Sequence, residues 1–287
     1  MILRPDSSPL SRNIEDYPEG IIIPIDKPYR WTSADVIRKV KFAAIRHFGK
    51  KNLKVGHAGT LDPLATGVLL VCIGKATKLA ETLQSHDKEY IAGITFGATT
   101  PSYDLEKEID RFFPHEHITS EAVEAALPSF IGEQDQIAPL FSAKSVDGVR
   151  AYELARNLHK EGKTLDEAAE ELIRVSRISI TELELMSYRP AGVILKTDDD
   201  CNLVSNASSR INVTDNSALG LPRAEVRMAC SKGTYVRAFA RDLGETLGSG
   251  AHLDSLQRSR SGIFRVEDAL TVEQAIALLP PPQHPTH

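Results

Sequence analysis

Apolar residues recur along the chain with two different periods, which predicts that strands and helices are interspersed. The stretch 223–230, RAEVRMAC, has an apolar residue at every second position, as in a strand with one buried face. In 32–51 apolar residues recur at helical spacing, after Thr32 or Ser33 as a cap and before Gly49 as a stop. The same patterns predict strands at 20–28, 68–74, 88–97, 173–185 and 261–270, and helices at 75–85, 118–132, 148–162, 231–248 and 271–279.

These elements do not follow a strict strand–helix–strand alternation, so we expect an α+β fold with a mixed sheet. Residues 1–20 carry prolines and acids without an apolar run and are expected to form a loose N-terminal extension. Residues 197–219 are polar and rich in turn formers, which predicts a flexible insertion in a hairpin. The proline-rich residues 280–287 predict a disordered tail.

Composition narrows the class of protein. The chain has 287 residues, of which 41% are hydrophobic and 25% charged, as in ordinary globular proteins. It contains no apolar run of the ~20 residues that a membrane span needs. The three cysteines, Cys72, Cys201 and Cys230, are far apart and form no metal-binding motif, so we expect neither disulfides nor structural zinc. A reducing, cytoplasmic location fits this cysteine usage best.

Charge is unevenly distributed although the net charge is only −5. Between residues 27 and 54 Asp35 is the only acid, against nine basic residues: Lys27, Arg30, Arg38, Lys39, Lys41, Arg46, Lys50, Lys51 and Lys54. Between residues 102 and 135 acids dominate instead. A basic segment of this kind more often forms solvated helix surfaces, and it is also consistent with a phosphate-binding surface.

The loop 56–67, GHAGTLDPLATG, holds a single carboxylate, Asp62. Pro63 restricts Asp62 to extended backbone, and the loop leads into an apolar strand, so the carboxylate has a defined direction. No Ser–His or Cys–His pair, second acid or metal-ligand set lies nearby. A nucleophilic carboxylate paired with a cation remains, and Arg237 in GTYVRAFAR can supply that cation. The alternatives are that Asp62 caps a turn and that Arg237 is a surface residue.

Several long motifs, in order, are similar to those of the TruB family, bacterial tRNA pseudouridine synthases that modify the T-loop uridine at position 55. The resemblance runs from Ile21 to about Leu279. It is carried by IDKPYRWTSADVIRKVK, GHAGTLDPLATGVLLVCIGKATK, DKEYIAGITFGATTPSYD, QIAPLFSAKSVDGVRAYELAR and SKGTYVRAFARDLGETLGSGAHLDSLQRSRSG. It implies a pseudouridine synthase fold, with a largely antiparallel central sheet flanked by helices and loops and a catalytic cleft, over a catalytic domain of residues 21–279.

The resemblance also assigns roles to residues. Asp62 matches the catalytic aspartate, Arg237 the arginine that pairs with it, and Tyr90 the tyrosine that stacks on the target base. Whether Tyr90 also assists proton transfer is left open by the resemblance. The remaining matches are to a histidine that holds the flipped-out T-loop, to further substrate-pocket residues and to a lysine that braces the active-site loop: His57, Tyr235, Leu256 and Lys27. The implied reaction isomerises uridine to pseudouridine without cofactor or metal. Asp62 would either attack the sugar or base directly or assist elimination through a glycal-like intermediate.

The resemblance implies a tRNA T-stem-loop as substrate, and we expect a monomer without an obligate protein partner or a membrane association. Two alternatives stay open, an RNA-folding helper with secondary catalysis and a pseudouridine synthase acting on another RNA; an aspartate-nucleophile hydrolase is a remote third. Two features depart from the family pattern. The C-terminal RNA-binding module of the family is expected to be absent, and the insertion at 197–219 has no counterpart in the family.

Overall fold

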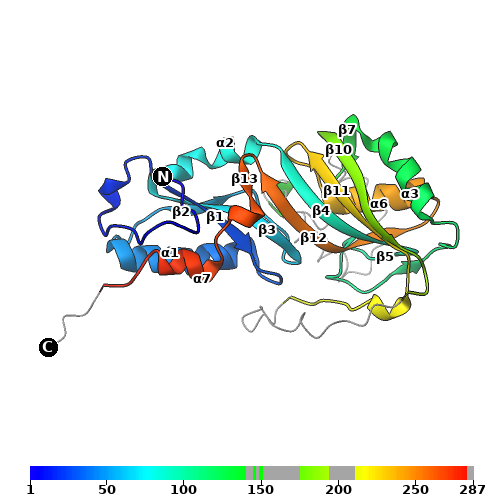
Figure 1. Cartoon of the computed structure of the whole chain (residues 1–287), viewed down its shortest axis with the longest axis horizontal. Helices are drawn as coiled ribbons and strands as arrows, with labels where there is room; N and C mark the ends of the chain where they lie inside the picture. The colour runs from blue at the N-terminus through cyan, green and yellow to red at the C-terminus, as the bar shows by residue number, and fades with distance from the viewer. Residues whose placement is uncertain (140–144, 147–148, 151–174, 194–210, 283–287) are drawn as a thin grey trace. The chain divides into compact units, whose positions relative to one another are not determined.

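The computed structural model describes residues 1–139, 145–146, 149–150, 175–193 and 211–282 (Figure 1). The helix expected at 148–162, most of the insertion expected at 197–219 and the end of the expected tail lie outside these residues. The chain divides into two compact units. The first unit comprises Met1–Ile91, Thr197–Ile211 and Leu256–His287, and the second comprises Ala92–Lys196 and Asn212–Ser255.

The first unit is built on the strand order β1-β3-β12, from β1 (Ile21–Lys27), β3 (Ala65–Ile73) and the second half of β12 (Ala251–Ser261). Two short strands, β2 (Val55–Ala58) and β13 (Phe264–Arg265), pair with β3 and β12. β12 runs parallel to β3, whereas β1 and β2 run antiparallel to it. The sheet is therefore mixed.

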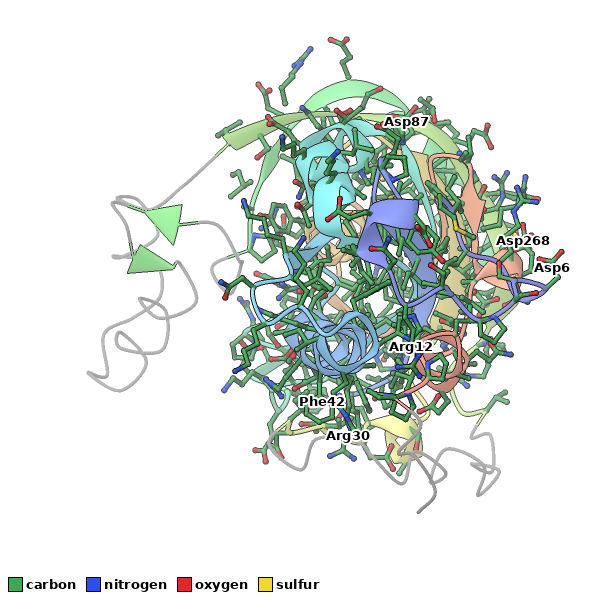
Figure 2. All side chains as sticks on the ribbon, turned by 90° about the vertical axis from the view of Figure 1, so that its left-hand side faces the viewer. Asp6, Arg12, Arg30, Phe42, Asp87 and Asp268 are labelled. Atoms are coloured by element: carbon green, nitrogen blue, oxygen red, sulfur yellow. The ribbon has the colours of Figure 1, made fainter. Side chains whose placement is uncertain are left out.

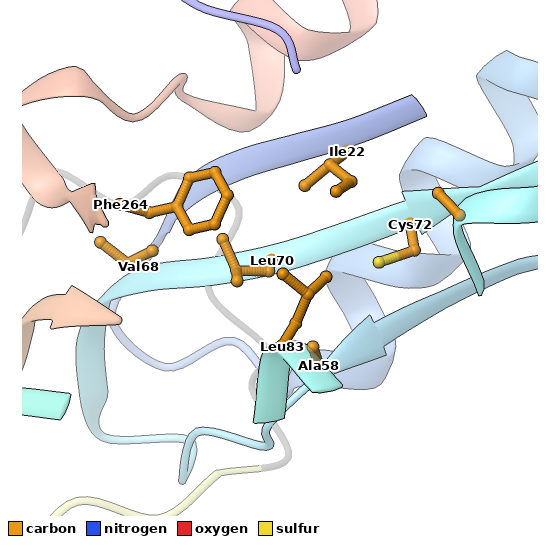
Figure 3. Close-up of a cluster of buried hydrophobic side chains, with 8 residues drawn as sticks. Ile22, Ala58, Val68, Leu70, Cys72, Leu83 and Phe264 are labelled. Carbon is orange, nitrogen blue, oxygen red and sulfur yellow. The ribbon is translucent and has the colours of Figure 1, made fainter. Parts of the chain in front are cut away.

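One face of β3 forms a buried apolar cluster (Figure 3). Val68, Leu70 and Cys72 alternate along the strand and so point to the same side. They pack with side chains of β1, β2, β13, the 3₁₀ turn Gly74–Leu79 and α2 (Ala80–Ser85), namely Ile22, Ala58, Phe264, Ala76 and Leu83. Because β3 is buried along almost its whole length, it is a rigid base for the loop that precedes it.

Helix α1 (Ser33–Phe48) follows β1 and begins and ends where the sequence predicts. The Thr32 hydroxyl accepts from the Asp35 N–H while the Asp35 carboxylate accepts from the Thr32 N–H, which forms a capping box. Gly49 ends the helix in the left-handed conformation that favours glycine. Figure 1 shows α1 beside α7 (Val272–Ala277), with α2 on the opposite side of the β1–β3 strands.

The second unit contains the strand order β4-β11-β10-β7, from the second part of β4 (Lys88–Phe96), β11 (Arg223–Cys230), β10 (Val175–Arg189) and β7 (Gly132–Ile137). β10 runs antiparallel to both its neighbours. The helices of the second unit are α3 (Ser120–Ala126), which a 3₁₀ turn at Leu127–Phe130 follows, and α6 (Val236–Thr246). Phe130 and Phe239 pack edge to face with ring centroids 5.3 Å apart. The expected α+β class with a mixed, largely antiparallel sheet is confirmed.

Two expectations were wrong. The N-terminal residues are not loose: the Leu3 side chain is fully buried, and backbone hydrogen bonds join Met1 and Leu3 to Ile22. Apart from Ser261, which ends β12, only β13 is a strand within 261–270, and a 3₁₀ turn at Val266–Asp268 follows it. Strands β2 and β12 were not expected. β12 buries the polar side chains of His252, Arg258 and Ser261, which removes the apolar alternation that identifies a strand.

Candidate active site

Asp62 lies in a tight turn at the entrance to β3. The Ala65 N–H donates to the Asp62 carbonyl (3.1 Å), which closes a turn with Pro63 at its second position, where the fixed φ of proline is favoured. The side chain of Asp62 is half-buried, whereas Leu61 and Leu64 on either side are buried. The turn therefore anchors its leucines in the core and leaves the carboxylate partly accessible.

Lys27, the last residue of β1, supports this turn from the protein interior. Its side chain is fully buried, and Nζ donates to the carbonyls of Pro28 (2.9 Å), Trp31 (2.6 Å) and Pro63 (3.1 Å). An ammonium has three N–H donors, so these carbonyls use all of them. Burial lowers the pKa of Lys27 to about 7, opposed by the negative charge of Asp62 and, less strongly, of Asp26. This geometry fits a bracing role, because the buried ammonium has no surface to offer a substrate.

Arg258 on β12 holds both ends of the Asp62 loop. Its side chain is 1% exposed. Nε donates to the Val68 carbonyl (2.7 Å), Nη2 to the Gly59 carbonyl (3.1 Å) and Nη1 to the Thr60 carbonyl (3.5 Å). A planar guanidinium spreads five donors over a rigid fork, whereas the three donors of a lysine all radiate from one nitrogen. Arg258 therefore fixes the distance between the start and the end of the loop.

Gly67 is required where the loop meets β12. It pairs with Arg258 in the parallel ladder and has φ +95°. A Cβ atom at this position would lie 2.2 Å from the Arg258 carbonyl oxygen. The Gly67 N–H also donates to the Asp26 carboxylate (3.0 Å). Burial raises the pKa of Asp26, although this hydrogen bond and the positive charge of Lys27 lower it in part. Only glycine permits the close approach of the loop exit to β12.

The N-terminus of α1 provides a further fixed point. The Leu61 N–H donates to the Ser33 hydroxyl (3.0 Å), and the same hydroxyl donates to the Leu61 carbonyl (3.1 Å). Ser33 is 3% exposed, so water does not compete for these bonds. The residue immediately before Asp62 is therefore held on both its backbone groups.

Three other expected site residues lie in the first unit. His57 is on β2, half-buried, and its pKa is lowered by burial and by the positive charge of Arg258, which favours the neutral ring. Leu256 is half-buried on β12, opposite Ala65 in the parallel ladder, and therefore adjoins the exit of the Asp62 turn. Tyr90 is on β4 and is 8% exposed. His57 and Leu256 therefore come from β2 and β12, each of which pairs with β3.

Arg237 and Tyr235 lie in the second unit, at the start of α6. Arg237 is 5% exposed, and its Nη1 donates to the Ser102 carbonyl (3.0 Å) and lies 3.7 Å from the Asp104 carboxylate. The Tyr235 backbone is held by the buried side chain of Gln136, which accepts from its N–H (2.8 Å) and donates to its carbonyl (3.1 Å). Arg237 thus has a buried acidic neighbour in its own unit, and its pairing with Asp62 stays a prediction.

Sequence reasoning assigned no role in the site to Arg258, Ser33 or Asp104. Arg258 stands in the quoted motif LDSLQRSRSG, but nothing in the pattern of that segment indicates that its side chain is buried. Ser33 was interpreted only as a helix cap. Among the described residues no cluster of three His, Cys, Asp or Glu side chains is arranged to bind a metal, and no helix is long and apolar enough to cross a membrane.

The pKa of Lys27 makes stability depend on pH. Because its pKa is about 7 in the folded chain and near 10.5 in the unfolded chain, folding releases a proton between these values. The free energy of unfolding therefore rises with pH above about 7, by at most about 1.4 kcal/mol per pH unit from this group. Urea unfolding of the wild type and Lys27→Met between about pH 7 and pH 8.5 should show this rise in the wild type only. Equal slopes for both proteins would contradict the assignment.

Comparison with known proteins identifies relatives over most of the chain. The family model TruB family pseudouridylate synthase (N terminal domain) matches residues 46–202. A protein of Phocaeicola vulgatus named tRNA pseudouridine synthase B is 48% identical, and the alignment covers 90% of this chain and 92% of that protein. A protein of the same name from Bacteroides fragilis is 46% identical, over 89% of this chain and 92% of that protein. In Flavobacterium johnsoniae the identity is 39%, over 90% and 95%.

Two solved structures share the fold. A chain of a Cbf5–Nop10–Gar1 complex aligns with a TM-score of 0.57 and 23% identity, over 96% of this chain and 58% of that chain. A chain of an H/ACA ribonucleoprotein bound to a substrate RNA containing 2′-deoxyuridine aligns with a TM-score of 0.55 and 20% identity, over 95% and 58%. At these identities the likeness concerns the fold alone. Because the family model covers more than half of the sequence and the named relatives cover nearly all of it, this chain belongs to the TruB family of pseudouridylate synthases.

Proposed function

We propose that this protein isomerises uridine to pseudouridine in tRNA, at position 55 of the T-loop, with Asp62 as the catalytic residue. The observation that carries the proposal is the Asp62 turn. Its carboxylate is partly accessible, while its backbone is fixed by Ser33 and by two buried cations, Lys27 and Arg258. A catalytic group must be held in this way to act on a base without rearrangement of the loop. The relatives named tRNA pseudouridine synthase B support the choice of substrate.

The reaction rearranges one bond. The glycosidic C1′–N1 bond breaks, the detached uracil rotates, and a C1′–C5 bond forms. N1 gains a proton and C5 loses one, so the reaction is balanced without an oxidant or another substrate. Asp62 takes part either as a nucleophile toward the sugar or base or as a group that assists elimination, and both routes need the same carboxylate position.

The other residues have roles around this step. The target base has to leave its stack before its glycosidic bond is accessible. We assign the stacking of that base to Tyr90, the holding of the opened loop to His57, and contacts with the flipped nucleotide to Tyr235 and Leu256. Arg237 is proposed to pair with Asp62, and its orientation within the second unit is set by Ser102 and Asp104. Lys27 positions the loop.

The T-loop of tRNA is the proposed partner. We further propose that the protein acts as a monomer in the cytoplasm. We also propose that residues 21–279 form the catalytic domain. This extent agrees with the alignments to the named relatives, which cover about nine tenths of this chain.

The assay is direct. Purified protein is incubated with unmodified tRNA transcript, and the position of pseudouridine is read by mass spectrometry of nuclease fragments. A transcript with cytidine in place of the T-loop uridine is the matched control. We expect one new pseudouridine, at position 55, in the first transcript and none in the second. Pseudouridine at another site, or only in ribosomal RNA, would overturn the choice of substrate, and released free uracil would indicate a hydrolase.

A further inference from the structure

Helix α1 has one face whose charge is not neutralised by its surroundings. We call this the α1 basic face and define it by the exposed residues Arg38, Lys39, Lys41, Phe42 and Arg46. At 100° per residue these five positions fall on one side of the helix, opposite the buried positions Val36, Val40, Ala43, Ala44 and His47. Arg38 pairs with Asp35, whereas Lys39, Lys41 and Arg46 form no ion pair with any other described residue. The face therefore presents concentrated positive charge to solvent.

Phe42 is an unusual member of this face. It is 63% exposed in the middle of a charged helix surface, and the Arg46 guanidinium lies over its ring at 5.4 Å from the centroid. A cation–π contact of this kind orients the guanidinium and reduces the entropy that it loses on binding an anion. Figure 2 shows Phe42 and Arg30 at the lower edge of the view, outside the α1 coil. Phe42 thus orients the Arg46 guanidinium toward solvent, where an external anion can bind it.

The apolar side of the helix argues against a membrane as that partner. A basic helix that lies on a lipid surface inserts its apolar face into the boundary between headgroups and acyl chains. In α1 that face is already buried in the first unit, since Val36, Val40 and Ala44 are fully buried. Phe42 is the only large apolar side chain that the helix exposes. A polyanion with regularly spaced charges, such as a nucleic-acid backbone, fits the face better.

The α1 basic face is mechanically joined to the candidate catalytic loop. Ser33, the first residue of α1, holds Leu61, which precedes Asp62. From Ser33 to Arg46 the helix rises about 20 Å at 1.5 Å per residue. A ligand bound along this face is therefore held within a helix length of the Asp62 turn, and both belong to the first unit.

We propose that the α1 basic face binds the phosphate backbone of the substrate RNA outside the flipped nucleotide. The inference rests on the proposed function and adds to it a binding surface distinct from the reacting residues. Each cation that meets a phosphate releases counterions, so its contribution to affinity falls as salt concentration rises. The surface then contributes to substrate capture and not to the chemical step.

The test compares the wild type with the triple variant Lys39→Gln, Lys41→Gln, Arg46→Gln on unmodified tRNA transcript. We expect KM to rise on the order of tenfold to a hundredfold at moderate salt while kcat at saturating RNA stays within about twofold. The slope of log Kd against log salt should fall by about one for each cation that contacts a phosphate. The control variant Arg4→Gln, Arg177→Gln, Arg265→Gln removes the same charge from exposed positions outside α1 and should leave KM and the slope near wild-type values.

The outcomes separate this proposal from the proposed function. If the wild type forms pseudouridine and the triple variant has unchanged KM and salt slope, the α1 basic face does not bind RNA and the proposal is wrong. An equal rise of KM in the control variant would also overturn it, because net charge alone would then explain the effect. Binding of the wild type to anionic vesicles of phosphatidylserine and phosphatidylcholine, lost in the triple variant whose KM is unchanged, would assign the face to a membrane instead. A wild type that forms no pseudouridine refutes the proposed function.

Discussion

Asp62→Asn is expected to abolish pseudouridine formation while RNA affinity stays within a fewfold of the wild type. The substitution keeps the size of the side chain, and the turn around it is held by backbone bonds from Lys27, Ser33 and Arg258 that do not involve the carboxylate. An amide cannot act as a carboxylate nucleophile or proton acceptor. Tritium release from RNA labelled at C5 of uridine measures turnover, and filter binding measures affinity.

Asp26→Asn is the matched control for this prediction. Asp26 is a carboxylate of the same unit, and its role is to accept from the Gly67 N–H, which an amide oxygen also does. We expect Asp26→Asn to retain most of the turnover. Tritium release by Asp62→Asn at a rate comparable with the wild type would refute the catalytic assignment, and the loss of both RNA affinity and cooperative unfolding would show that Asp62 is structural.

The elements with regular patterns could be predicted from the sequence, and the reasons are local. β1, β3, β4 and β11 follow apolar runs or alternation, and α1 has both its cap and its glycine stop. The loop that carries Asp62 could be located because a proline and several glycines mark it. In each case the information lies within a few residues of the element.

What could not be predicted depends on contacts between distant segments. Arg258 is almost two hundred positions from the carbonyls of Gly59 and Thr60, and a buried arginine has the same local sequence as an exposed one. The same holds for Asp104, whose neighbour Arg237 lies on another element. The packing of Leu3 against β1 depends on a parallel bridge between Ile2 and Ile22, which a polar, proline-containing sequence does not indicate. Long-range burial of polar groups is therefore the part of the site that required the structure.

The different shapes of Lys27 and Arg258 explain why two cations are needed to hold the backbone of the Asp62 loop. Lys27 is a point charge that binds the carbonyls of Pro28 and Trp31, between β1 and α1, and of Pro63. Arg258 is a planar group that reaches carbonyls on both sides of the loop. The two cations repel each other, which contributes to the lowered pKa of Lys27, and the charge of Asp62 offsets part of that repulsion. The carboxylate and its supports therefore stabilise one another.

Arg258→Met is the second substitution for which we expect a large effect. Methionine fills much of the space but donates no hydrogen bond, so the carbonyls of Gly59, Thr60 and Val68 lose a shared donor. Each buried carbonyl left unsatisfied costs about 1–3 kcal/mol, and we expect the free energy of unfolding to fall by about 3 kcal/mol. In the folded fraction, a shift of the Asp62 turn by about 1 Å should lower kcat on the order of a hundredfold. Urea unfolding and single-turnover kinetics measure the two effects.

Two further variants separate positioning from general stability. Arg258→Lys keeps the charge but provides a single donor group, so it should recover part of the stability and little of kcat. Arg223→Met removes a partly buried arginine of the second unit, whose guanidinium binds the Asp254 carboxylate at 2.7 Å. It should destabilise the fold with kcat preserved once the folded fraction is taken into account. If Arg258→Met loses no more kcat than Arg223→Met at equal folded fraction, Arg258 serves stability alone, because positioning of Asp62 requires an effect on the chemical step.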